Sequence, residues 1–416
     1  MVDRRHFLKR SLGATLLAAM PGPLKSFARP LPSGADEDAF WASVQRAFTV
    51  ERSIIHLNNG GVCPSPRVVQ EAEFAIMAEA QRGPFYAFEG QVAPQIEAVR
   101  DQLARHLGCT GDEVAFMRNT SEAMETVQFG LSLDRGDEIV TTMHDYPRML
   151  RTWEQRSRRD GVVVRKVPVP VPLANPEDLV GAIVGAITPR TRLVMCCHMV
   201  DLTGQVLPVR AIADEAHARG VPVLVDGAQT FGHLPFTMDD LDCDYFATSL
   251  HKWMMGPQGT GALYVRKDRI ADIWSLMSSD ASSSSDIRKF EDIGTSPPAR
   301  ILALADAMAF HAAIGSERKR DRLVTLRNYW LGDVLRYDRV RLLTNTNAAG
   351  ALATISIDGI DPLALRNHLW DRHRIRVRPI RQENVSGIRV SAGIYNTFDE
   401  LDHLSSILEP IIRYGI

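Results

Sequence analysis

Net charge, cysteine and long apolar runs are all scarce in this chain. Its 416 residues carry a formal net charge of −2, so neither nucleic acid nor an anionic membrane is expected as a main partner. A composition of 45% hydrophobic and 24% charged residues is typical of a globular protein, and the length is enough for two domains. The cysteines are odd in number and have no metal-ligand spacing, which argues against a disulfide framework and a metal site: Cys63, Cys109, Cys196, Cys197 and Cys243.

The first residues predict a segment that is not part of the fold. DRRHFLK at 3–9 precedes the apolar run SLGATLLAAM, which is too short to span a bilayer comfortably. Residues 26–28 fit the small–any–small rule for cleavage after Ala28. The stretch resembles a twin-arginine export signal, which implies the twin-arginine translocation machinery as a partner and a periplasmic location. We therefore expect residues 1–28 to be a signal peptide, and we expect no stable membrane span.

The stretch CDYFATSLHKWMMGPQGTGALYV, residues 243–265, places a lysine where open α/β sheets bind ligands. A short apolar run ends near Ala247, and Ser249, His251 and Lys252 follow before a glycine-rich turn. The carboxyl ends of parallel strands border the ligand crevice in such sheets. An amine in a partly dry site has a lowered pKa and can form a Schiff base with an aldehyde. Lys252 is therefore a candidate catalytic residue, although a lysine taken alone is more often a solvated loop residue.

A second motif, PVLVDGAQTFGHLP, supplies a carboxylate on a neighbouring strand. Val223 to Val225 form a short apolar strand, Asp226 ends it, and Gln229 lies just beyond. Pyridoxal phosphate (PLP) needs an amine that holds its aldehyde as an imine and a carboxylate that keeps its ring nitrogen protonated. Lys252 and Asp226 meet both needs, so PLP is the expected cofactor.

DGAQ followed by SLHKWMMGPQGTGALYV resembles the class V aminotransferase family of fold-type I PLP enzymes. The family includes cysteine desulfurases, kynureninases and isopenicillin N epimerase-like proteins, and the likeness runs from LNNGG at 57–61 to IRVSAGIYNT at 388–397. It implies an α/β fold-type I transferase that forms a homodimer. The expected parts are an arm at 29–55, a PLP-binding large domain at 56–298 with a mostly parallel seven-stranded sheet, and a smaller α+β domain at 299–416.

The resemblance also implies which residues bind the cofactor. A strand at 114–117 leads into a helix whose amino terminus is a seat for an anion, although Ser and Thr there also cap helices. The phosphate is expected on Thr120, Ser121, the backbone of Glu122, Ser249 and His251, with Thr295 reaching the phosphate of the neighbouring subunit. Gln229 is expected at the ring hydroxyl. An aromatic ring is expected over the pyridine, with Tyr146 favoured and His144 as the alternative.

Three further residues are expected to lie near the substrate. Arg389 matches the arginine that the family uses for the substrate α-carboxylate, and its planar fork suits that group. Asn59 lies in a turn that the family uses as an active-site edge. Asp201 is counted among the cofactor-pocket residues, yet the family usually has Asn, Ser or Thr near it. An acid there casts doubt on carboxylate binding at this point and favours a cationic substrate group.

These residues do not choose among the reactions of such a cofactor. We expect an exported enzyme that acts on an amine or amino-acid group of a small molecule or peptide, with transamination as the leading reaction. By analogy with exported family members, tailoring of a secondary metabolite or peptide siderophore is a plausible setting. The alternatives are an epimerase, a carbon–sulfur lyase, and an inactive binding protein of the same fold. A persulfide-type desulfurase is disfavoured, because no cysteine follows Cys243.

Overall fold

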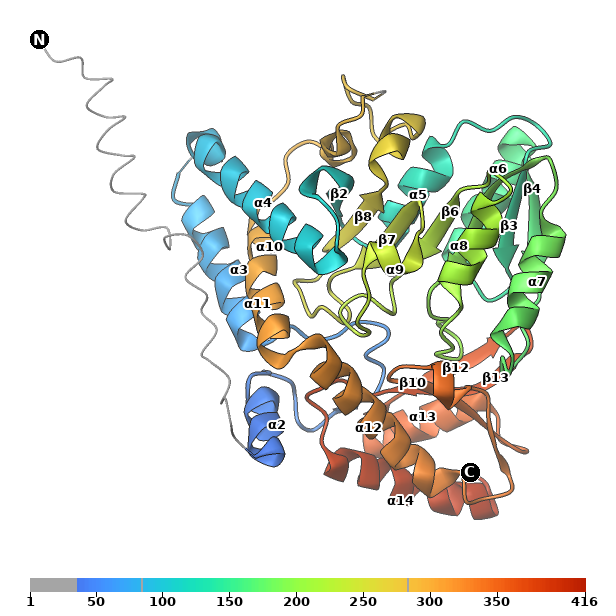
Figure 1. The fold of residues 1–416 in the computed structure, drawn as a ribbon. Coiled ribbons are helices and arrows are strands. Elements are labelled where there is room, and N and C mark those ends of the chain that lie inside the picture. Colours follow the sequence, from blue (N-terminus) through green and yellow to red (C-terminus); the bar gives the residue numbers. More distant parts are fainter. Residues whose placement is uncertain (1–35, 84, 283) are drawn as a thin grey trace, which may run out of the picture.

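The computed structural model describes residues 36–416, apart from residues 84 and 283 and the side chains of 85–89 and 91. The predicted export signal, residues 1–28, therefore lies outside the described residues. Figure 1 shows a large sheet flanked by helices and a smaller sheet beside it that contains the carboxyl-terminal strands. Among the helices described, none is long and apolar enough to cross a bilayer.

The large sheet has seven strands, as predicted. Their order is β2 (Val114–Met117), β8 (Gly261–Val265), β7 (Tyr245–Ser249), β6 (Val223–Asp226), β5 (Thr191–Cys197), β3 (Glu138–Thr142) and β4 (Val163–Val167). All pairings are parallel except those that β8 makes with β2 and β7. The mostly parallel sheet and the α/β class expected from the sequence are confirmed.

Both faces of the inner strands are buried, which explains the apolar runs of β5 and β6, whereas the edge strand β4 is largely exposed. Successive side chains of a strand point to opposite faces. Val223 and Val225 of β6 accordingly belong to one core, and Leu224 belongs to another. The first core is completed by α4 (Phe85–Leu107), α7 (Pro176–Ala186), α8 (Val209–His217) and α9 (Met238–Leu241). The second is completed by α5 (Thr120–Gly130) and α6 (Pro147–Asp160) (Figure 1).

The smaller sheet is antiparallel, with the order β12 (Arg378–Gln382), β13 (Val385–Ser391), β10 (Leu352–Ile357) and β9 (Val340–Leu342). Helices α12 (Ser316–Val334), α13 (Pro362–His373) and α14 (Phe398–Tyr414) share its apolar core. This is the expected small α+β domain, although the boundary near residue 299 stays a prediction. Helices α10 (Ala299–Leu302) and α11 (Leu304–Ile314) still pack against α3 (Arg67–Ala80), on the side of the large sheet.

The arm at 36–56 is attached to the small domain. Helix α2 (Glu37–Arg46) buries Phe40 and Val44 in a core shared with Leu323 of α12. Strand β1 (Ile55–His56) then pairs in parallel with β11 (Ile375–Arg376). These contacts fix the start of the turn at 57–61, which lies between the two sheets.

Several strand ends of the large sheet meet at one edge. Cys197, Asp226 and Ser249 end the parallel strands β5, β6 and β7. Strand β2 runs in the same direction as β7, because both are antiparallel to β8, so its end and the start of α5 reach this edge too. Polar and ionisable residues from segments far apart in the chain therefore lie close together at this edge.

Gly261 lets β8 approach the turn that begins α5. A Cβ on Gly261 would lie 2.7 Å from Asn119 Cα and 2.8 Å from the Thr248 carbonyl oxygen. We expect Gly261→Ala to lower the free energy of unfolding by about 1–3 kcal/mol, because backbone atoms must move apart. Thermal unfolding measures the effect.

Gly181→Ala in α7 is the matched control for that substitution. A Cβ there meets no atom within 4 Å, and alanine favours a helix by up to about 1 kcal/mol over glycine. The control should leave stability unchanged or raise it. Equal effects of the two substitutions would contradict the proposed close approach.

Candidate active site

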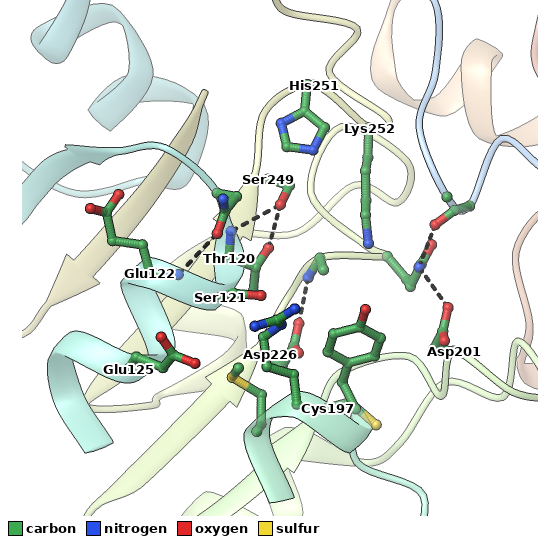
Figure 2. A pocket seen from close by; sticks show the side chains of 18 of the residues that line it. Thr120, Ser121, Glu122, Glu125, Cys197, Asp201, Asp226, Ser249, His251 and Lys252 are labelled. Carbon is green, nitrogen blue, oxygen red and sulfur yellow. Dashed lines mark hydrogen bonds between the residues drawn. The ribbon is translucent and has the colours of Figure 1, made fainter. Parts of the chain in front are cut away.

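A cavity of about 620 Å³ opens at the carboxyl edge of the large sheet. Ten of the residues expected at the site line it: Thr120, Ser121, Glu122, Tyr146, Asp201, Asp226, Gln229, Ser249, His251 and Lys252. Figure 2 shows the Lys252 side chain extending into the cavity, with Thr120 and Ser249 on one side and Asp201 on the other. The cavity thus brings together groups from β6, β7, α5 and the loop after β5.

Lys252 belongs to a tight turn that follows β7. Its backbone N–H donates to the Ser249 carbonyl at 3.2 Å, and its carbonyl accepts from Met255 N–H at 3.0 Å. Burial lowers the pKa of the Lys252 amine, while the carboxylates of Asp201 and Asp226 oppose that shift. An amine with a lowered pKa is unprotonated for a larger part of the time, which is what attack on an aldehyde requires.

Asp226 is buried, with 7% of its surface exposed. Burial raises its pKa to about 6, against a hydrogen bond of 2.9 Å that its Oδ1 accepts from Ala228 N–H. The Lys252 charge also lowers this pKa, whereas Asp145 and Asp201 raise it. A carboxyl group that titrates close to neutrality, at the end of a strand beside the lysine, suits the protonated ring nitrogen of PLP.

The amino terminus of α5 forms a site for an anion. Asn119 caps the helix by accepting from Glu122 N–H at 2.9 Å, and the hydroxyls of Thr120 and Ser249 are 2.7 Å apart. The Glu122 carboxylate accepts a hydrogen bond of 2.8 Å from Arg118 Nε. Because the Glu122 N–H donates to Asn119, the predicted backbone contact of Glu122 with the phosphate would have to replace that cap, and it stays a prediction. The helix dipole and these hydroxyls fit the phosphate of PLP.

His251 lies near the same site. Its Nδ1–H donates to the Thr260 carbonyl at 2.9 Å, and burial lowers its pKa. The ring is thereby held in one orientation with Nε2 free of that bond. The orientation agrees with the predicted phosphate contact, which stays a prediction.

The two candidates for the stacking ring have different environments. Tyr146 caps α6, is 40% exposed and lines the cavity. His144 is buried, does not line the cavity, and donates from Nε2 to Asn384 Oδ1 at 2.6 Å. Of the two residues, the structure places only Tyr146 where a ring can cover the cofactor.

Asp201 lies between two arginines of the small domain. Its Oδ2 accepts from Arg378, and its Oδ1 accepts from Arg389 and, at 3.0 Å, from Gln229 Nε2. Burial would raise the pKa of Asp201, but the two guanidinium groups hold it well below its usual value. The charge of Asp201 is already balanced by these two guanidinium groups. The geometry therefore does not support the expected contact between Asp201 and a cationic substrate group.

Arg389 is completely buried and does not line the cavity. Its Nη1 also donates to the Asp201 carbonyl at 2.7 Å, and its Nη2 donates to Asn58 Oδ1 at 2.7 Å. A Cβ on Gly60 would lie 3.1 Å from that Nη2, so the glycine covers the guanidinium closely. The predicted role in α-carboxylate binding therefore requires a substrate to compete with Asp201.

Gln229 makes three hydrogen bonds through its side-chain amide. Its Nε2 donates to the Gly60 carbonyl at 2.8 Å as well as to Asp201, and its Oε1 accepts from Trp253 Nε1 at 3.1 Å. Both amide hydrogens are thus engaged, whereas Oε1 keeps a second lone pair that could accept from the ring hydroxyl of PLP, and that predicted contact stays a prediction.

Asn59 and Thr295 lie outside the cavity. Asn59 is fully buried, where its Nδ2 donates to Ser391 O at 3.0 Å and its Oδ1 accepts from Tyr395 at 2.8 Å. It ties the turn to the small domain, and its neighbours Gly60 and Gly61 line the cavity instead. Thr295 is exposed, as its predicted role across a dimer would require, and that role stays a prediction.

Several lining residues were not expected from the sequence. They include Arg118, Glu125, Arg148 and Cys197. Each ends a strand, directly follows one, or lies in the first two turns of a helix at this edge, and this position is the sequence signal that could have indicated them.

The sequence profile of the family "Aminotransferase class-V" matches residues 62–404. Isopenicillin N epimerase of Amycolatopsis lactamdurans is 31% identical over 394 residues, which cover 90% of this chain and 99% of that protein. A cysteine desulfurase of Haloferax volcanii is 27% identical, over 86% of this chain and 89% of that protein.

Among solved structures, the cystine C–S lyase C-DES in complex with its product cysteine persulfide superposes with a TM-score of 0.78. Its sequence is 25% identical, and the match covers 86% of this chain and 97% of that one. Amine, carboxylate and anion seat share one cavity, and the family profile spans most of the chain. The chain belongs to the class V aminotransferase family and has its fold-type I, PLP-dependent architecture.

Proposed function

We propose that this class V enzyme acts on a primary amino group and that Lys252 carries the proton. The observation that carries the proposal is the convergence of Lys252 and Asp226 on one poorly solvated cavity. PLP, when bound, withdraws electrons from the carbon that bears the substrate amine. Lys252 then takes a proton from that carbon and returns it, while Asp226 holds a proton towards the ring nitrogen. The amino terminus of α5 fixes the phosphate, and Tyr146 shields the ring from water.

Transamination is the leading reaction in this proposal. A mobile amine over the cavity can return the proton to a different atom from the one it left. PLP, when bound, would keep the substrate nitrogen, and one water would supply the oxygen of the carbonyl product. Epimerisation, in which the proton returns to the same carbon, is the second candidate, because isopenicillin N epimerase aligns over nearly the whole chain. The similarity to a cystine C–S lyase keeps elimination as a further outcome of the test.

A persulfide mechanism is not part of the proposal. All five cysteines lie within the described residues, and none follows Cys243. Cys197 is the one that lines the cavity, and burial raises its pKa well above the usual value. A buried thiol that stays protonated is a poor nucleophile.

The purified protein tests the proposal directly. We expect it to be yellow, to change its spectrum with an amine donor, and to lose colour on borohydride reduction, because Lys252 forms an imine with PLP. Lys252→Ala should abolish turnover and leave the cofactor unattached to the protein by mass spectrometry. Lys267→Ala removes a largely exposed lysine and is the matched control, which should behave as wild type.

The products then separate the reactions. A ketoacid or aldehyde indicates transamination, an inverted centre indicates epimerisation, and pyruvate with ammonia indicates elimination. A folded protein that stays colourless with PLP would overturn the proposal and favour a binding protein.

Replacing Asp201 tests how the site treats a carboxylate. Asp201→Asn leaves Arg378 and Arg389 without their anion, so a free carboxylate no longer competes for them. We expect α-amino acids to bind on the order of tenfold more tightly, with the matching decarboxylated amines unaffected. Spectral titration of the PLP-loaded protein gives both dissociation constants.

Asp272→Asn is the control, because Asp272 is exposed and lies outside the cavity. The substitution at 201 also removes the partner of buried charges, so thermal unfolding must show that the variant is folded. Equal affinities of wild type and Asp201→Asn for an α-amino acid would show that the arginines are not reached by the substrate.

We further propose that the protein is exported by the twin-arginine route and acts in the periplasm as a homodimer on a small-molecule or peptide amine. The motif DRRHFLK and the apolar run that follows support export, and the family resemblance supports the dimer. A peptide siderophore or other secondary metabolite is the setting suggested by analogy.

Replacing Arg4 and Arg5 by lysine should block export and retain the protein in the cytoplasm, because the translocation machinery reads the arginine pair. Cell fractionation followed by immunoblotting measures the distribution. A double substitution of Arg135 and Arg158, both beyond the signal, is the control. Unchanged periplasmic protein in the signal variant would contradict this route.

A further inference from the structure

The residue after the catalytic lysine is held by three residues from two other segments, the turn after β6 and helix α12. Trp253 is 1% exposed, and its indole N–H donates to Gln229 Oε1 at 3.1 Å. Its ring stacks on His233, with the centroids 4.1 Å apart and the planes inclined by 28°. Its carbonyl oxygen accepts from the Nζ of Lys319 in α12. The side chain and the main chain of Trp253 are thus both restrained.

The contact with Lys319 restrains the turn that presents Lys252. The Trp253 carbonyl belongs to that turn, in which Met255 has a left-handed φ of 60°. A left-handed conformation is unfavourable for a residue other than glycine and persists where the surroundings enforce it. The Lys319–Trp253 hydrogen bond is one of the interactions available to enforce it.

Burial of the charged Lys319 amine costs free energy, and packing alone does not explain why a lysine occupies this position. Only 1% of its surface is exposed, and burial lowers its pKa to about 7. Its second hydrogen-bond partner is His311 Nδ1, at 3.4 Å. Neither partner is an anion, so nothing in these two contacts compensates a charged amine. A methionine of similar length would fill this volume without that cost.

A second cavity gives the Lys319 region access to solvent. It has a volume of about 400 Å³, and its lining includes His106, Met254, His311 and Ser316. His311 Nε2 lies 3.0 Å from Ser316 Oγ, and the rings of His106 and His311 meet edge to face at 5.8 Å. The cavity is distinct from the one that Lys252 enters, yet it reaches the same turn through Met254, and His311 of its lining contacts Lys319.

We propose that Lys319 is a positioning residue for Lys252: its amine holds the Trp253 carbonyl, and through it the turn that aims the catalytic amine into the cofactor cavity. His311 connects this amine to the second cavity, which is separate from the cofactor cavity. The inference rests on Lys252 being the lysine that binds PLP.

The groups around Lys319 determine how it responds to pH. From the other elements, it faces His311 of α11, His233 of the turn after β6, Cys63 and, beyond His311, His106 of α4. Burial lowers the pKa of all three histidines and raises the pKa of Cys63 to about 12, so these groups are neutral at pH 7. Lys319 is then the member of this cluster that changes charge near neutrality.

The sign of the pH effect follows from that arrangement. The folded-state pKa of Lys319 lies below the value near 10.4 of an unfolded lysine. The cost of burying the charge is therefore fully present below pH 7 and disappears as the pH rises towards 10. The free energy of unfolding therefore increases as the pH rises from about 7 towards 10, because Lys319 loses its unfavourable buried charge.

Lys319→Met tests the proposal, with Lys289→Met as the matched control. Lys289 is also a buried lysine, and its Nζ donates to the carbonyls of Ile270 at 2.7 Å and Ser284 at 2.9 Å, outside the cofactor cavity. Both variants remove an amine and keep a similar stem. We expect only Lys319→Met to weaken the apparent affinity for PLP, on the order of tenfold, and to shift the pH at which the imine absorbance changes. Equilibrium dialysis and absorbance titration of the full-length protein measure the two quantities.

Thermal unfolding of the PLP-free protein between pH 6 and pH 10 is the second measurement. The stability of Lys319→Met should depend less steeply on pH than that of wild type. The inference is overturned if Lys319→Met matches Lys289→Met in PLP affinity and in the imine titration. If wild type itself forms no imine, the proposed function fails instead, and the two failures are therefore distinguishable.

Discussion

An amine and a carboxyl group share one poorly solvated cavity, and the rest of the structure keeps them there. Burial lowers the pKa of Lys252 and raises that of Asp226 to about 6, so both groups titrate closer to neutrality than they would in water. Each shift favours the neutral form, and each is limited by the charge of the other group. Their placement follows from two adjacent parallel strands, β6 and β7, whose carboxyl ends reach the same edge.

The family resemblance implies that Arg389 is available to a substrate carboxylate, whereas in the structure Arg389 is paired with a carboxylate of the protein. Asp201 compensates Arg378 and Arg389, which come from the small domain. A carboxylate built into the protein therefore occupies the groups that would otherwise receive the carboxylate of a substrate. Under the proposed function, we expect this arrangement to favour amines whose adjacent carbon carries no free carboxylate.

The small domain takes part in the site through polar contacts as well as packing. Arg389 of β13 donates to Asn58, and Asn59 donates to the Ser391 carbonyl of the same strand. Pairing of β1 with β11 anchors the start of that turn. Gly60 and Gly61 consequently form a wall of the cavity whose position depends on how the two sheets are docked.

The sequence by itself determined the sheet, the cofactor and the central pair. Apolar runs of strand length, with Asp226 at one end and Lys252 just past another, identify the edge and its chemistry, because burial and strand direction are local properties of the chain. The cap at Asn119 likewise locates the anion seat through a contact within one turn of helix.

Tertiary structure alone decided which distant charges meet. The sequence left both Tyr146 and His144 as candidates for the ring that covers the cofactor. The fold pairs His144 with Asn384, a contact that the sequence did not indicate. The partners of Asp201 lie 177 and 188 residues along the chain, and Lys319 lies 66 residues from the carbonyl it holds. Such pairs depend on the docking of the small domain and α12 against the large sheet, a global outcome of packing that no local pattern encodes.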